Sequence, residues 1–293
     1  MSGTPTCGPS PTSRRTREDI EILREQIYEM VAEAHPMTVR QCFYRGVGFG
    51  YWNKTEADYK NVVCRLLVQM RRERILPFHW IADGTRWQRK PTTFSSVEDA
   101  LAETARLYRR RLWDHSARTV EVWLEKEALA GVLLGVTSDF DVPLMVTRGY
   151  PSLSYLHSAA EDIRLRSQRR GQDTTVLYFG DRDPSGDDIA RRVELDLCEL
   201  SGVDVEFIRC AVTEEQVDLF ELPTRPTKSK DSRARTWSGT GSVEVDAIDP
   251  PLLRALLREW ISSYVDEHEL ETLRTIEAEE RGVLVALSRD GIR

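Results

Sequence analysis

The residues of this chain that could do chemistry gather in two short acidic segments, each placed after an apolar run. "VLYFGDRDPSGDD" sets Asp181 and Asp183 directly after residues suited to a buried strand, and Glu125 follows the run "VEVWL". Side chains alternate along an extended backbone, so Asp181 and Asp183 point to the same side. Carboxylates brought together repel one another unless a hard divalent cation neutralises them. Glu125, Asp181 and Asp183 are therefore predicted to hold Mg²⁺, which Mn²⁺ can replace.

A second interpretation of the Asp-rich segment is structural. An Asp-rich turn also forms the N-terminal cap of a helix that begins at Pro184. Pro184 suits a first helical turn and Gly186 permits close approach in either case. The residue pattern leaves both interpretations open.

The elements that must position these acids lie in the second half of the chain. Short β-rich runs alternate there with helical stretches near 126–136, 152–169 and 184–200, and the runs are "TVEVWLEK", "VPLMVTRGY", "TTVLYFGD" and "VDVEFIRC". This alternation predicts a parallel sheet with helices on its faces, whose ligands gather at the carboxyl ends of the strands. The polar segment 222–242 is predicted to be a mobile loop, and a helix is expected from about 250 to 280.

The first half reads as helices followed by a hairpin. Thr16 resembles the cap of an amphipathic helix, Thr38 and Gln41 form a capping box for "TVRQCFYRGV", and a third helix begins at Thr55. "ILPFHWIADGTRW" then predicts a strand, an Asp-Gly turn and a second strand. Three helices and a hairpin are the order of a winged helix-turn-helix, a DNA-binding module.

The predicted fold class is α/β, with a winged helix-turn-helix placed before a parallel-sheet domain. Its predicted parts are a disordered tail (1–15), the winged-helix domain (16–94), a helical linker (95–118) and a metal-binding α/β domain with a C-terminal helical extension (119–293).

Composition limits the class of protein. The chain has 293 residues, of which 40% are hydrophobic and 30% charged, as in soluble globular proteins. It has neither an apolar run of membrane-spanning length nor a signal-peptide pattern, so we expect a cytoplasmic protein with no membrane partner. Its five cysteines are widely spaced and include no CxxC pair. A disulfide framework or a zinc site is not indicated.

Charge is distributed unevenly along the chain. Residues 1–118 carry 20 Lys and Arg against 14 Asp and Glu, whereas residues 119–293 carry 21 against 34. A basic half suits a polyanion and an acidic half suits cations, although solvated surface charge explains such an asymmetry as well. Arg outnumbers Lys by 35 to 6. This excess suits phosphate contacts, but codon bias in a GC-rich genome produces it too.

Three motifs carry a resemblance to a known family. "MTVRQCFYRGV", "LEKEALAGVL" and "GDRDPSGDDI", with "TRGYPS" before the last, are similar in type and order to segments of the topoisomerase VI A-subunit family, which includes the meiotic double-strand-break proteins. The resemblance covers roughly residues 37–190 and is closest to compact stand-alone mini-A-type relatives. It implies a CAP-like winged helix in 16–94 and a Toprim domain in 119–293. Ser152 departs from the pattern, because an acid is expected there.

The resemblance also implies site residues and a reaction. Tyr44 would be the nucleophile, Arg40 its neighbour one helical turn away, and Glu125, Asp181 and Asp183 the Mg²⁺ ligands. The reaction would be DNA cleavage by transesterification, leaving a 5′-phosphotyrosyl link. A phenol with a pKa near 10 needs nearby positive charge for this role. On spacing alone, Tyr44 fits a core position better, and the lone histidines His35 and His79 are further candidate bases.

The implied partners follow from the same resemblance. A double-strand break needs two nucleophiles, so we expect a homodimer that binds double-stranded DNA, located in the cytoplasm with the nucleoid. The chain shows no ATPase module, so strand passage would require a separate ATPase subunit. Basic residues of the third helix and the predicted wing are expected to contact DNA phosphates, namely Lys60, Arg65, Arg71, Arg72, Arg86, Arg89 and Lys90.

Two other functions remain open at this point. The chain could be a metal-dependent hydrolytic Toprim nuclease of a defence system or mobile element, in which Tyr44 is inert. It could also be a DNA-binding protein that does not cleave, whose acidic residues serve the fold and dimer contacts.

Overall fold

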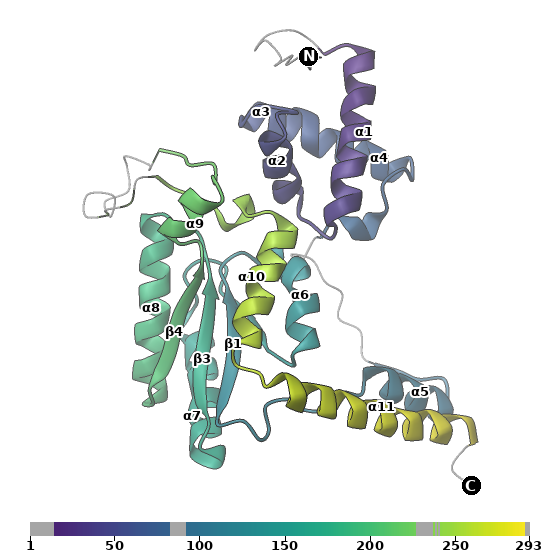
Figure 1. The fold of residues 1–293 in the computed structure, drawn as a ribbon, viewed down its shortest axis with the longest axis vertical. Helices are drawn as coiled ribbons and strands as arrows, with labels where there is room; N and C mark the ends of the chain where they lie inside the picture. Colours follow the sequence, from purple (N-terminus) through teal and green to yellow (C-terminus); the bar gives the residue numbers. More distant parts are fainter. Residues whose placement is uncertain (1–14, 83–91, 227–236, 238, 240, 291–293) are drawn as a thin grey trace.

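A computed structural model describes residues 15–82, 92–226, 237, 239 and 241–290. Within these residues the chain forms a helical unit and an α/β unit, and the helical unit sits beyond one end of the sheet (Figure 1). The part of the predicted tail before Arg15 lies outside the described residues.

The helical unit confirms the three predicted helices. It consists of α1 (Arg17–Ala34), α2 (Val39–Gly48), α3 (Glu56–Asp58), the π-helical segment η1 (Tyr59–Cys64) and α4 (Arg65–Arg72). Thr16 and Thr38 each form a capping box, and the Thr55 hydroxyl accepts a hydrogen bond from Asp58 N. The apolar faces of these helices meet in one core, which includes Ile27, Phe43, Leu66 and Met70.

The predicted strand at the start of the wing is wrong. Phe78–Trp80 forms a 3-10 turn (η2), and Ile81 makes a single parallel bridge to Met37. The backbone of Met37 forms two hydrogen bonds with this stretch: its N–H donates to Trp80 O and its carbonyl accepts from Ala82 N. Tertiary pairing thus determines the conformation of a short apolar run that periodicity alone cannot assign. The rest of the predicted hairpin, 83–91, lies outside the described residues.

The α/β unit confirms the predicted parallel sheet. Its strands are β1 (Arg118–Leu124), β2 (Leu144–Val146), β3 (Asp173–Phe179) and β4 (Val205–Ala211). They are ordered β2-β1-β3-β4 and every neighbouring pair is parallel. Their carboxyl ends therefore point to one edge of the sheet, toward the helical unit (Figure 1).

Helices cover both faces of the sheet, as its alternating side chains require. One face packs against α6 (Ala130–Asp139) and α10 (Pro250–Ser262), with Val122 and Leu177 in that core. The other face packs against α7 (Leu153–Arg170) and α8 (Pro184–Ser201), with Trp123 and Tyr178 in that core. The short elements η3 (Glu127–Leu129) and α9 (Glu214–Leu219) complete this part of the unit.

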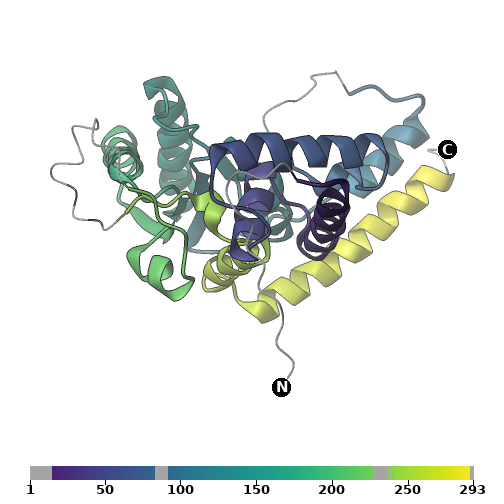
Figure 2. The same ribbon diagram turned by 90° about the horizontal axis from the view of Figure 1, so that it is seen from above.

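The predicted helical linker is helical only in its first part, because α5 (Val97–Leu107) ends before the run "YRRR". That run lies along α11 (Glu267–Asp290), where Tyr108 and Arg110 contact Glu280 and Arg109 contacts Glu277. These contacts replace the expected continuation of the helix. In both views α5 and α11 lie side by side and project from the rest of the α/β unit (Figure 2).

The predicted single helix near 250–280 is two helices. α10 ends at Ser262, and α11 starts at Glu267 after Asp266, whose carboxylate accepts from the N–H groups of His268 and Glu269. A carboxylate in that position is a helix N-terminal cap. None of the helices in the described residues is both long and apolar enough to span a membrane.

The segment 245–249 of the α/β unit contacts the helical unit. It contains η5 (Val245–Ala247), against which α2 packs. Thr38 Oγ1 donates to Asp246 Oδ1 at 3.3 Å, and the Arg45 guanidinium pairs with Asp249. Arg254 of α10 also donates to the carbonyls of Ala34 and Pro36. The junction holds α2 over the carboxyl ends of the strands.

Candidate active site

A cleft of about 890 Å³ lies at this junction. Its walls come from α2 and η1 on one side and from the carboxyl ends of β1 and β3 on the other. Charged side chains of both signs line it, including Arg40, Arg71, Glu125, Lys126, Asp181, Asp183, Arg225, Glu244 and Asp246. The predicted acidic residues and Arg40 are thus brought into one cavity.

Glu125 and Asp181 are adjacent, as the parallel register of β1 and β3 requires. Glu125 Oε2 accepts a hydrogen bond from Asp181 N at 3.0 Å. Gly180 makes room for this contact, because a Cβ there would lie 2.7 Å from Glu125 Oε2. Burial and the charge of Asp181 raise the pKa of Glu125 to about 7. Two carboxyl groups are therefore buried next to each other at the ends of β1 and β3.

Asp183 serves the helix that follows it. Its Oδ1 accepts from Gly186 N at 2.7 Å, which caps α8, and Pro184 occupies the first turn. Gly186 lets the helix start close to the sheet, because a Cβ there would lie 2.2 Å from Asp181 O. The capping interpretation is confirmed for Asp183. Its carboxylate also lines the cleft, so capping does not remove it from the acidic cluster.

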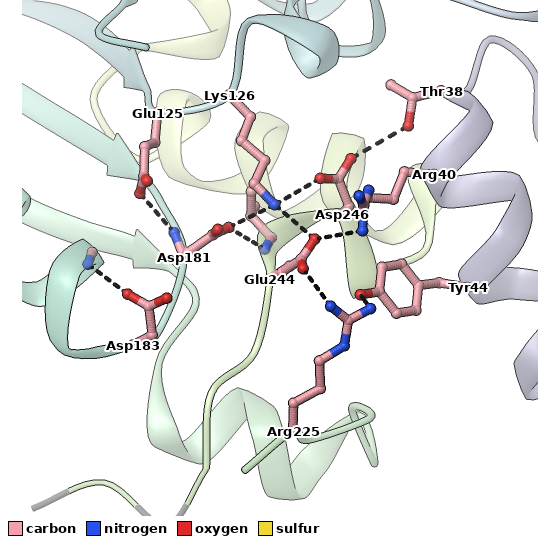
Figure 3. A network of polar contacts seen from close by, with 12 residues as sticks. Thr38, Arg40, Tyr44, Glu125, Lys126, Asp181, Asp183, Arg225, Glu244 and Asp246 are labelled. Carbon is pink, nitrogen blue, oxygen red and sulfur yellow. Dashed lines mark hydrogen bonds and ion pairs between the residues drawn. The ribbon is translucent and has the colours of Figure 1, made fainter. Parts of the chain in front are cut away.

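Lys126 occupies the centre of the acidic cluster (Figure 3). Its ammonium lies 3.1 Å from Asp181 Oδ1, 3.1 Å from Glu244 Oε2 and 2.8 Å from Asp246 Oδ2. Burial lowers the pKa of Lys126, but the charges of Asp246, Asp181 and Glu244 outweigh burial and raise it. Lys126 is therefore a fixed positive charge that compensates part of the cluster.

Tyr44 belongs to α2 but is not one of the residues that line the cleft, and it is only 5% exposed. Its hydroxyl accepts a hydrogen bond from Arg225 Nη2 at 2.7 Å. Burial and the charge of Glu244 raise the pKa of Tyr44, while Arg225 and Arg40 act to lower it. Tyr44 is thus a buried core residue whose hydroxyl faces a cationic side chain.

A continuous series of polar contacts joins Tyr44 to the acids (Figure 3). Arg225 contacts both the Tyr44 hydroxyl and Glu244. Glu244 contacts Arg40 at 3.4 Å and Lys126 at 3.1 Å. From Lys126 the series continues to Asp181, whose N–H donates to Glu125. Residues from both units therefore form one network.

The basic residues predicted to contact DNA are placed differently from one another. Arg71 lines the cleft, whereas Lys60, Arg65 and Arg72 are exposed. Arg86, Arg89 and Lys90 lie outside the described residues. The candidate bases His35 and His79 pack in an aromatic cluster with Trp80. Ser152, where an acid was expected, caps α7 by accepting from Tyr155 N.

The donor set suits a hard divalent cation, although the side chains do not form a finished site. In the described parts of the chain, no group of three or more His, Cys, Asp or Glu is positioned to hold a metal ion. Asp181 Oδ1 is turned to Lys126 and to Val245 N. Glu125, Asp181 and Asp183 offer carboxylate oxygens, which are ligands that Mg²⁺ takes, and burial followed by the charge of Asp181 raises the pKa of Glu125. Mg²⁺ therefore remains a prediction that fits the chemistry of these residues.

Sequence analysis misses four residues of the network: Lys126, Arg225, Glu244 and Asp246. Of the predicted mobile loop 222–242, residues 227–236, 238 and 240 lie outside the described residues. Arg225 and Ser242 exchange backbone hydrogen bonds of 2.9 and 2.8 Å. Lys126 could have been noticed as the cation beside Glu125. No local pattern marks Arg225 or Glu244. Neither a protein-family model nor a curated protein sequence matches the chain.

Proposed function

We propose that the chain is a DNA-cleaving enzyme of the topoisomerase VI A-subunit type. In this proposal the helical unit is a winged-helix DNA-binding domain and the α/β unit is a Toprim domain. Tyr44 is the nucleophile, and Glu125, Asp181 and Asp183 hold Mg²⁺. The observation that supports this best is the continuous polar network from the Tyr44 hydroxyl to Glu125, because it joins Tyr44 to the acidic residues that line the cleft.

The proposed reaction uses the buried Tyr44 together with side chains that line the cleft. The Tyr44 oxygen loses its proton to solvent and forms a bond to phosphorus, the bond from phosphorus to the 3′ oxygen breaks, and that oxygen takes up a proton from solvent. Bound Mg²⁺ would supply positive charge at the phosphate. Arg40 lines the cleft and its charge acts to lower the pKa of Tyr44, so it favours the phenolate that attacks.

The proposed assembly is a homodimer on double-stranded DNA. One phenol cuts one strand, so a double-strand break requires two copies, and two-fold symmetry suits the symmetric duplex. The exposed Lys60, Arg65 and Arg72 on η1 and α4 are the proposed contacts to DNA phosphates. Cleavage coupled to strand passage would need a separate ATPase subunit.

The test is a covalent adduct. Purified protein is incubated with 5′-labelled and 3′-labelled DNA and Mg²⁺ or Mn²⁺, then stopped with detergent. We expect protein attached to 5′ ends, free 3′ hydroxyls, and loss of the adduct in Tyr44→Phe. Tyr51→Phe is the matched control, because the Tyr51 ring packs on Phe49 and Trp52 outside the network.

Other outcomes identify the alternatives. The burial of Tyr44 favours a hydrolytic Toprim nuclease. Free ends on both strands, with Tyr44→Phe as active as the wild type, would establish that reaction. Retarded DNA with no cleavage, unchanged by Glu125→Gln or Asp181→Asn, would indicate a DNA-binding protein that does not cleave.

A further inference from the structure

The Tyr44 hydroxyl has a cationic partner that comes from the other unit. Arg225 belongs to the stretch 222–226, and its Nη2 donates to the Tyr44 oxygen at 2.7 Å. Its guanidinium also lies over the Tyr44 ring, 5.7 Å from the ring centre. Charge and hydrogen bonding therefore act on the one atom that the proposed reaction makes nucleophilic.

The Arg225 guanidinium is oriented by a second contact. Its Nη1 donates to Glu244 Oε1 at 2.9 Å, while Nη2 faces Tyr44. Glu244 is itself held by Lys126. Because both terminal nitrogens of this planar guanidinium are hydrogen-bonded, it has little freedom to rotate away from Tyr44. A lysine ammonium in the same place would rotate more freely.

Lys54 fixes the backbone that carries Arg225. The Lys54 ammonium donates to the carbonyls of Pro223 and Thr224 at 2.9 and 3.3 Å. These are the two residues directly before Arg225. Lys54 also lies over the Tyr44 ring, 5.5 Å from its centre. It thus connects the loop after α2 to the Arg225 stretch across the site.

We infer that Arg225 is a catalytic residue, which stabilises the Tyr44 oxygen as its proton leaves, and that Lys54 is a positioning residue, which sets Arg225 against Tyr44. This inference rests on the proposed function. In the reaction, Arg225 keeps its protons throughout, donates a hydrogen bond to the phenolate, and loses that bond as the oxygen–phosphorus bond forms.

The first experiment measures the phenol without requiring cleavage. The full chain is labelled with tyrosine carrying ¹³C at Cζ, the Tyr44 signal is assigned with Tyr44→Phe, and its titration is followed by NMR. In Arg225→Gln we expect the pKa of Tyr44 to rise by about one unit, a tenfold change in phenolate. Arg258→Gln is the matched control, because Arg258 pairs with Asp139 away from the cleft. An unshifted Tyr44 in folded Arg225→Gln overturns the inference.

The second experiment measures adduct formation against pH. Arg225→Gln is expected to slow adduct formation at neutral pH by about 10²-fold, with partial recovery at alkaline pH. Arg225→Lys keeps the charge and should recover part of the rate. Lys54→Met should slow the reaction and raise the pKa of Tyr44, and Lys54→Arg should restore both, because a guanidinium can also donate to two carbonyls.

The two experiments separate the inference from the proposed function. If the wild type forms no adduct, the proposed function fails, while the NMR titration still decides whether Arg225 acts on Tyr44. If the wild type forms the adduct and Arg225→Gln matches it at every pH, Arg225 has only a structural role. If Lys54→Met leaves both the titration and the rate unchanged, Lys54 does not position Arg225.

Discussion

The ammonium of Lys126 lies 3.1 Å from Asp181 Oδ1, so a fixed positive charge stands beside a carboxylate proposed to bind a divalent cation. The same ammonium contacts Glu244 and Asp246. Burying carboxylates together is unfavourable unless cations are present. Lys126 therefore allows the cluster to fold before any metal binds.

Lys126→Met should destabilise the fold and increase its response to metal. Removing one partner of a largely buried ion cluster typically costs about 3–5 kcal/mol. Mg²⁺ should then raise the melting temperature of Lys126→Met more than that of the wild type. The matched control is Lys60→Met, since Lys60 is 68% exposed and pairs with Glu56 on the surface; its cost should be below about 1 kcal/mol. Equal Mg²⁺ responses in wild type and Lys126→Met would contradict this account.

Glu125→Gln should change how stability depends on pH. The pKa of Glu125 is raised from 4.5 to about 7 in the folded chain, chiefly by burial and by Asp181. A raised carboxyl pKa means that its contribution to stability is present below 4.5 and is lost as pH rises toward 7. The neutral amide does not titrate and so avoids this loss. As pH rises from 4.5 to 7, the free energy of unfolding of the variant should therefore increase by about 3 kcal/mol relative to that of the wild type. Urea unfolding at a series of pH values measures the difference, and parallel stability curves would disprove it.

Thr38→Val should weaken the junction between the units. The Thr38 hydroxyl accepts from Gln41 N at 3.0 Å and donates to Asp246 at 3.3 Å. Losing the helix cap and the buried partner of Asp246 should reduce the free energy of unfolding by about 2 kcal/mol. Thr38→Ser keeps the hydroxyl and should lose much less. Chemical denaturation compares the two, and equal losses would show that the hydroxyl contributes little.

Gly186→Ala should disturb the site through the backbone. An added Cβ would lie 2.2 Å from Asp181 O, so either α8 or Asp181 must move. We expect the free energy of unfolding to fall by about 1–3 kcal/mol and, under the proposed function, DNA cleavage to be lost. Gly135→Ala is the control, because nothing lies within 4 Å of its Cβ position in α6; it should gain about 0.5–1 kcal/mol. A neutral Gly186→Ala would show that the contact relaxes easily.

Under the proposed function, Arg65→Gln should weaken DNA binding through charge alone. Arg65 is exposed on α4, and each lost phosphate contact lowers the slope of log affinity against log salt by about one. Fluorescence anisotropy at several salt concentrations measures that slope. Arg274→Gln on α11 should leave it unchanged. Identical slopes for both variants would place the DNA elsewhere on the molecule.

Local patterns were sufficient for most of the architecture. Short apolar runs that alternate with helical stretches identify the four parallel strands, because both faces of the sheet are covered and more than half of each strand is apolar. Capping residues such as Thr16, Thr38 and Pro184 identify helix starts, because they satisfy backbone groups within a few residues. Parallel pairing of the strands then explains why Glu125 and Asp181 meet.

Most of the errors share one physical cause, which is contact between distant parts of the chain; the division of the predicted helix near 250–280 is the exception, because Asp266 caps α11 locally. Arg109 and Arg110 leave the helical conformation to pair with Glu277 and Glu280. Phe78–Trp80 follows the backbone of Met37. Arg225 belongs to a segment with the composition of a loop, and only its tertiary partners Tyr44 and Glu244 reveal its place in the site. Periodicity carries no information about such pairs.

The contacts between the two units also determine when the cleft can form during protein synthesis. Thr38 meets Asp246 across 208 positions of sequence, and Arg45 meets Asp249 across 204. During synthesis on the ribosome, the helical unit and all four strands emerge before these partners exist. Contacts of such long sequence separation form late and slow the final docking. A nascent chain consequently has no completed cleft until the ribosome has translated the segment that carries Asp246 and Asp249.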